Sequence, residues 1–103
     1  MSAGAPAPAG KRVPTLWTKV VEPFLRQERT TLERGCEHLL FPFVIRGQEV
    51  ADRDQESYER AAKNLRLFLN EMLKVARERG YKSLHEDTFA EARLRLCPLF
   101  PFC

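Results

Sequence analysis

The feature that most constrains this chain is a long amphipathic stretch in its centre, where apolar side chains recur at spacings of three and four residues. Its members are Tyr58, Ala61, Ala62, Leu65, Phe68, Leu69, Met72, Leu73 and Ala76. The stripe keeps its phase over about five helical turns. It predicts one long α-helix that buries a single face, and therefore a chain of the all-α class.

Both ends of this helix carry ordinary boundary signals. Asp52 or Asp54 can cap its first turn, and acidic residues gather near the start while basic residues gather near the end. Gly80 suits a left-handed cap, with Tyr81 placed for the hydrophobic contact that often accompanies such a cap. We expect the helix to stop there.

An earlier helix is predicted from a second apolar stripe that begins near Thr15. Pro23 fits the first turn of a helix better than its middle, so we expect this helix to begin near Glu22. Thr15–Val21 is then a separate short turn that carries Trp17. Pro42 should end the helix at about Phe41, and residues 41–45 should form an extended connector lying on the core.

A third helix is predicted after Gly80. Ser83-Leu84-His85-Glu86 has the spacing of a capping box, in which the serine and glutamate side chains satisfy exposed amides at a helix start. The helix should run from about Leu84 to Leu96, bury Phe89, Ala92 and Leu96, and close at Cys97-Pro98.

These elements predict a small three-helix domain over residues 14–97, with a long central helix. Residues 1–13, rich in alanine and proline, should form a disordered arm, because they cannot bury enough apolar surface to become ordered. Residues 98–103 should form an extended apolar tail. This tail either packs over the small core or docks on a partner, and the sequence leaves both alternatives open.

Composition narrows the setting of the protein. The chain has three cysteines and no recognisable export signal or membrane-spanning segment, so we expect an intracellular protein with reduced thiols. The formal net charge of +3 comes from mixed positive and negative residues. Nucleic acid is therefore permitted as a partner but not favoured.

Catalytic and metal-binding patterns are missing from the sequence. It has no glycine-rich phosphate loop, no HExxH helix and no nucleophile elbow, and we expect no enzyme. Cys36 and His38 would point about 200° apart on a helix, and Cys97 and Cys103 do not form a familiar chelating turn. His85 fits a solvent-facing position. No cofactor or metal is predicted, although the sequence leaves a redox or metal role of the cysteines open.

Without catalytic groups, binding is the favoured function. We expect a small helical accessory or assembly subunit that binds another protein or a larger complex, because aromatic residues dominate the energetics of interfaces. The expected docking residues are Trp17, Phe41, Phe43, Leu99, Phe100 and Phe102.

Part of the chain resembles a known module. Residues Tyr58–Arg93, and above all Val75-Ala76-Arg77-Glu78-Arg79-Gly80-Tyr81, look like the small C-terminal helical module of light-independent protochlorophyllide reductase subunits. In that family the module follows a large nitrogenase-like domain that this sequence lacks, so neither reductase activity nor iron–sulfur chemistry is expected. The resemblance leaves a tetrapyrrole- or metal-associated helper protein as one alternative function.

The same segment is similar to the latter half of a histone fold, in which a long helix is followed by a short loop and a short helix that Asp87 would open. That resemblance implies a dimeric, nucleic-acid-binding subunit as the other alternative. The residues expected to meet phosphates are Lys74, Arg77, Arg79 and Lys82.

Overall fold

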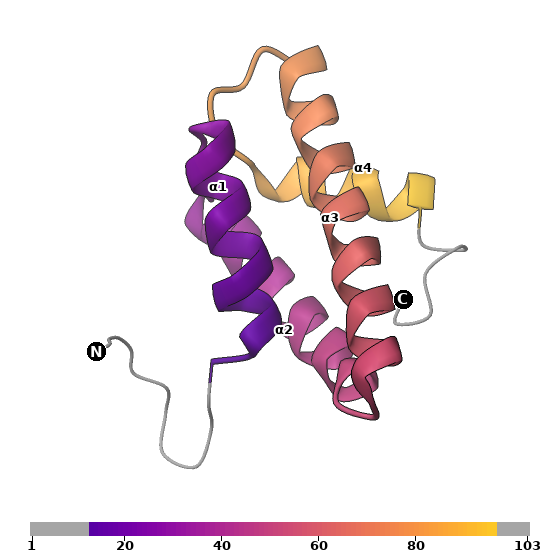
Figure 1. Cartoon of the computed structure of the whole chain (residues 1–103). Coiled ribbons are helices and arrows are strands. Elements are labelled where there is room, and N and C mark those ends of the chain that lie inside the picture. The colour runs from indigo at the N-terminus through magenta and orange to yellow at the C-terminus, as the bar shows by residue number, and fades with distance from the viewer. Residues whose placement is uncertain (1–12, 97–103) are drawn as a thin grey trace.

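The computed structural model describes residues 13–96, and these residues confirm the all-α class (Figure 1). In chain order the elements are η1 (Trp17–Val21), α1 (Glu22–Glu28), α2 (Arg34–Ala51), α3 (Gln55–Glu78) and α4 (Glu86–Leu96). The described residues thus form four α-helices rather than the three expected. Most of the expected arm and all of the apolar tail, residues 1–12 and 97–103, lie outside them.

The long central helix is confirmed as α3. Asp54, the second of the two expected caps, accepts a hydrogen bond from the Ser57 amide at 2.7 Å. At the other end Gly80 has a φ of 76°, and the Tyr81 amide bonds back to the Ala76 carbonyl at 2.9 Å. These bonds satisfy backbone groups that a helix end would otherwise leave without partners.

The helix start predicted near Glu22 is confirmed, because α1 begins at Glu22, but the stretch before it differs from the prediction. The turn around Trp17 is a π-helical segment, η1, that continues directly into α1 rather than standing apart from it. In this segment the Glu22 amide bonds to the Trp17 carbonyl, one residue farther back than in an α-helix. Pro23 lies in the first turn of α1, a position that tolerates a proline better than the middle of a helix does.

The end of that stretch corrects a second prediction, because the helix expected over residues 22–41 is two helices. Arg29 adopts a left-handed conformation with φ of 57°, and the Thr30 amide bonds to the Leu25 carbonyl, which ends α1 at Glu28. The chain then extends through Leu32, which forms an isolated parallel bridge with Leu84.

Pro42 does not end a helix, and residues 41–45 are not an extended connector. They lie inside α2, which runs on to Ala51. Pro42 and His38, one turn earlier, are both exposed, so the backbone hydrogen bond that the proline removes lies on the exposed side of the helix rather than in the core. The buried side chains of α2 instead belong to residues such as Leu40, Phe43 and Val44.

The start of α4 also differs from the prediction. Leu84 is held in the bridge with Leu32, so the helix begins at Glu86 and Ser83 is not its cap. The Ser83 hydroxyl instead donates to the Glu33 carboxylate at 2.8 Å, which ties the two connectors together. Phe89 and Ala92 are buried as predicted, and Leu96 is partly buried against the core.

Three aromatic rings form the centre of the packing. Phe43 of α2 stacks on Phe68 of α3 with ring centroids 4.5 Å apart, and Phe89 of α4 meets Phe43 edge-on at 5.5 Å. Each of the three side chains is at most 3% exposed. These rings therefore join α2, α3 and α4, while η1, which continues into α1, packs against α3 (Figure 1).

Candidate interaction surfaces

Of the apolar residues predicted to dock a partner, three pack inside the domain and the other three lie outside the described part of the chain. Phe43 is fully buried at the centre of the core, so it contributes to folding and is not presented to a partner. Trp17 is 7% exposed and meets the half-buried Phe41 edge-on, with ring centroids 5.1 Å apart. Trp17 therefore seals η1 against α2. The remaining predicted residues, Leu99, Phe100 and Phe102, lie outside the described part of the chain.

Three leucines that were not predicted as binding residues are exposed on the helices. Leu39 is 40% exposed, Leu67 is 50% exposed, and Leu94, near the end of α4, is 78% exposed. A single exposed leucine is common on protein surfaces. Leu94 differs from the other two because, in the sequence, it lies three residues before the apolar segment Cys97–Cys103.

The residues predicted to meet phosphates are partly engaged in internal ion pairs. The Arg77 guanidinium lies 3.5 Å from a Glu28 carboxylate oxygen, and Arg79 lies 2.9 Å from Asp87. Lys74 and Lys82 make no ion pair with any of residues 13–96. The structure therefore does not gather the four side chains into one unpaired basic surface.

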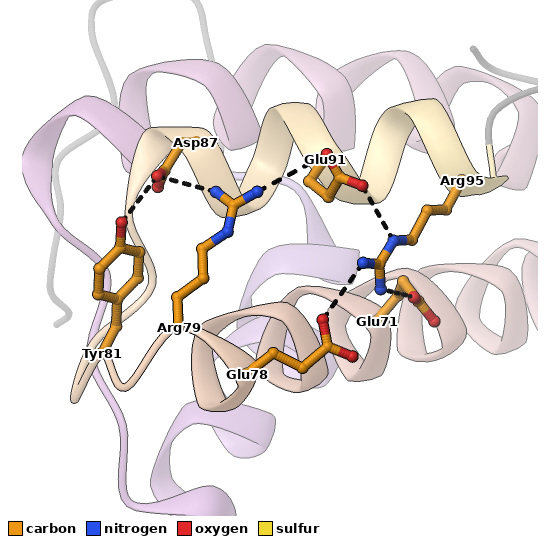
Figure 2. A network of polar contacts seen from close by, with 7 residues as sticks. All are labelled: Glu71, Glu78, Arg79, Tyr81, Asp87, Glu91 and Arg95. Atoms are coloured by element: carbon orange, nitrogen blue, oxygen red, sulfur yellow. Dashed lines mark hydrogen bonds and ion pairs between the residues drawn. The ribbon is translucent and has the colours of Figure 1, made fainter.

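A network of polar contacts instead joins α3 to α4 (Figure 2). Arg95 of α4 contacts three carboxylates, those of Glu71 at 2.8 Å, Glu91 at 3.1 Å and Glu78 at 3.2 Å. These hydrogen bonds raise the pKa of the Arg95 guanidinium above its ordinary value, and the bond with Glu71 has the largest effect, followed by the bond with Glu78. A planar group with several donors can hold such a network, whereas a lysine could not reproduce its geometry.

The other end of the network is centred on Asp87. One of its carboxylate oxygens accepts hydrogen bonds from the Tyr81 hydroxyl and from Arg79, each at 2.9 Å. The hydrogen bond from Tyr81, followed by the charge of Arg79, lowers the pKa of Asp87, and the same hydrogen bond raises the pKa of Tyr81. Asp87, which was predicted to open a helix, is thus also a link between α4 and the end of α3.

We expect Asp87→Asn to change how stability depends on pH. Because the folded-state pKa of Asp87 lies below its ordinary value of 3.8, the ionised carboxylate stabilises the fold at neutral pH. That contribution should persist as pH falls towards the ordinary value and disappear below it. The difference in melting temperature between the wild type and the variant should therefore be constant near neutrality and shrink in acid.

Thermal melts followed by circular dichroism from about pH 7 to about pH 2.5 would measure this difference. Glu49→Gln is a matched control, because Glu49 is exposed and no hydrogen bond or ion pair joins its side chain to residues 13–96. If the difference in melting temperature between the wild type and Asp87→Asn stayed unchanged down to the most acidic pH, the stabilising role of the ionised Asp87 carboxylate would be contradicted.

The potential metal ligands are dispersed in the structure. Cys36 is fully buried, and this burial, followed by the nearby charge of Glu86, raises the pKa of its thiol to about 12. His38 is exposed, while the His85 ring stacks on Tyr81 with centroids 4.1 Å apart. Among residues 13–96, no group of three or more His, Cys, Asp or Glu side chains is placed to hold a metal ion. Cys97 and Cys103 lie outside that range.

A surface hollow of about 440 Å³ lies between the start of the first helix and the end of α2. Gln48 fixes its wall, because the side-chain oxygen accepts from the Leu16 amide at 2.9 Å and the side-chain nitrogen donates to Asp52 at 2.9 Å. The lining residues are Val13, Pro14, Thr15, Ile45, Gln48, Glu49 and Asp52.

Comparison with known proteins identifies no relative of this chain. No family model matches the chain, and neither a curated protein nor a solved structure matches it. The two resemblances noted in the sequence therefore stay predictions. None of the helices in the described part of the chain is long and apolar enough to cross a membrane.

Proposed function

We propose that this chain is an intracellular, non-catalytic accessory subunit that binds another protein through the C-terminal end of α4. The observation that carries the proposal is the exposure of Leu94, which is 78% accessible on a helix whose other large apolar residues are buried or partly buried. In the sequence Leu94 is followed by the apolar residues 97–103, and a contiguous exposed apolar surface is typical of a protein-binding site.

The surroundings of Leu94 support this location. The other face of α4 is fixed to the domain, because Phe89 and Ala92 are buried and Arg95 holds the carboxylates of α3. The helix therefore presents Leu94 from a rigid base, which lowers the entropic cost of binding. In the sequence Leu94 is followed closely by Leu99, Phe100 and Phe102, and we propose that these residues extend the same surface.

The decisive variant is Leu94→Asp. Because the side chain is mostly exposed, the substitution should change the melting temperature by only a degree or two, as surface substitutions usually do. A charge in the middle of an apolar interface should nevertheless abolish partner binding. Leu39→Asp, on another exposed leucine, is the matched control.

Affinity capture from an extract of the native cells, with wild-type, Leu94→Asp and Leu39→Asp proteins in parallel, would measure this effect. We expect proteins that the wild type and Leu39→Asp retain in stoichiometric amount and Leu94→Asp loses. Equal retention by all three proteins, or sedimentation of the wild type as a lone monomer in that extract, would refute the proposed surface.

Deletion of Leu99–Cys103 tests whether the apolar C-terminal segment belongs to the interface or to the core. If the segment belongs to the interface, the truncated chain should keep its helical content and lose the partner. A fall in melting temperature well beyond about ten degrees with loss of helix would instead place the segment in the core, because each buried Leu or Phe contributes roughly 1.5 to 3 kcal/mol. In that case the interface reduces to the surroundings of Leu94.

A further inference from the structure

The outer face of α3 carries a second surface feature, a basic stripe that the proposed function does not use. Between residues 60 and 77 this helix has five basic residues and one acidic residue, Glu71. The Glu71 carboxylate is bound to Arg95 of α4. The exposed stripe consists of Lys63, Leu67 and Lys74, with Arg66 and Asn70 beside them.

Helical geometry places these side chains on one line. Lys63 and Leu67 are four residues apart, and Lys63 and Lys74 are eleven residues apart, which is about three turns and roughly 16 Å along the axis. The opposite face of α3 carries Phe68, Leu69 and other residues buried against the rest of the domain. The stripe is therefore the side of α3 that no described element covers.

The cations at the centre of the stripe make no close ion pairs, although Glu59 and Glu78 lie one turn beyond it on the same helix. Arg60 pairs with Glu56 at 3.3 Å and Arg77 pairs with Glu28 at 3.5 Å, one near each end of the stretch. By contrast, Lys63, Arg66 and Lys74 form no ion pair with any side chain of residues 13–96. Three unpaired cations over about three turns attract an anionic partner.

The stripe could bind either nucleic acid or an acidic protein surface, and Leu67 favours the second. It is 50% exposed and lies between the cations, at the centre of the stripe. A phosphate backbone offers nothing to cover an apolar side chain, whereas a protein helix can place its own apolar residue there. The combination of an apolar centre with a basic surround fits an acidic amphipathic helix better than it fits nucleic acid.

We propose that the stripe on α3 binds an acidic amphipathic helix of a partner protein. The apolar residue of that helix covers Leu67, and carboxylates about three turns apart pair with Lys63 and Lys74. Arg66 supplies a further cation at the edge of the contact. The surface is distinct from Leu94 on α4, so neither proposal depends on the other.

The test is a titration of the full chain with a synthetic helical peptide that carries one central leucine flanked by glutamates spaced to match Lys63 and Lys74. We expect the peptide to shift the backbone NMR signals of residues 63–74 selectively. A peptide with glutamine in place of every glutamate should bind at least about tenfold more weakly. No binding of the acidic peptide, or equal binding of both peptides, would overturn the proposal.

Charge-reversal variants make the same test from the protein side. Lys63→Glu combined with Lys74→Glu should weaken binding of the acidic peptide at least about tenfold, and Leu67→Ser should also weaken it several-fold. Lys19→Glu combined with Arg34→Glu reverses two exposed charges outside α3 and should leave binding unchanged. Circular dichroism would confirm that each variant is folded.

A titration with duplex DNA of about 20 base pairs tests the alternative that the stripe binds phosphates. If DNA bound more tightly than the peptide, with a steep salt dependence and no effect of Leu67→Ser, the stripe would be a phosphate-binding surface and the proposal would be wrong. The titration is repeated with Leu94→Asp, which should bind the peptide normally. A loss in that variant would assign the peptide to the surface on α4 instead.

Discussion

Phe43→Ala should lower the free energy of unfolding by about 3 to 5 kcal/mol, the usual cost of removing a buried aromatic ring. The Phe43 side chain is fully buried and contacts both Phe68 and Phe89, so its removal leaves a cavity where three helices meet. A domain of this size is stabilised by only about 5 to 15 kcal/mol. The variant should therefore lie close to the limit at which the fold survives.

Chemical denaturation and thermal melts would measure this loss, with a fall in melting temperature of at least about 12 °C expected. Leu67→Ala on α3 is the matched control, because its side chain is half exposed and its removal should cost no more than about 0.5 kcal/mol. A Phe43→Ala variant as stable as this control would show that the three rings are not the centre of the core.

The same residue shows where prediction from the sequence failed. Phe43 follows Pro42 in an apolar run, and a proline after a helical stripe ordinarily ends the helix. Here Pro42 lies on the exposed side of α2, where the loss of a backbone hydrogen bond costs less than it would in the core. The helix continues and Phe43 faces inward, so a residue that seemed free to dock belongs to the core.

The break after α1 could not be predicted for the opposite reason. Left-handed helix ends are usually marked by glycine, but Arg29 takes that conformation here. Its neighbours give no composition signal, and the apolar stripe continues in phase through Leu32 and Cys36. The connector that follows the break is bridged to Leu84, about fifty residues later, and a local pattern does not contain this contact.

Prediction worked where local signals agreed with one another. For α3 the apolar period, the Asp54 cap and the Gly80 terminus all indicate the same helix, and the structure has that helix. Side-chain partners are a different matter, because a sequence shows charges but not which helices lie side by side. Arg79 therefore looked available for a phosphate, while the structure pairs it with Asp87 and Glu91 of α4.

The link between the two connectors is the remaining feature with a large expected effect. Leu84 precedes α4, its amide donates to the Thr31 carbonyl at 2.8 Å, and its carbonyl accepts from the Glu33 amide at 2.9 Å. Its side chain is fully buried, whereas that of its bridge partner Leu32 is only partly buried. Leu84 thus anchors the α1–α2 connector to the α3–α4 connector by side-chain packing as well as by backbone bonds.

Leu84→Ala should cost about 2 to 5 kcal/mol, because it removes a buried leucine and leaves both backbone hydrogen bonds available. Leu32→Ala should cost less, and Leu94→Ala should be nearly neutral, in the order of their burial. Hydrogen exchange distinguishes a global from a local effect. If the connectors fold with the core, exchange in Leu84→Ala should accelerate equally at the Glu33 amide and at amides in the middle of α3. Acceleration at Glu33 alone would mean that the bridge opens independently of the helices, and that the core does not need the connectors to be joined.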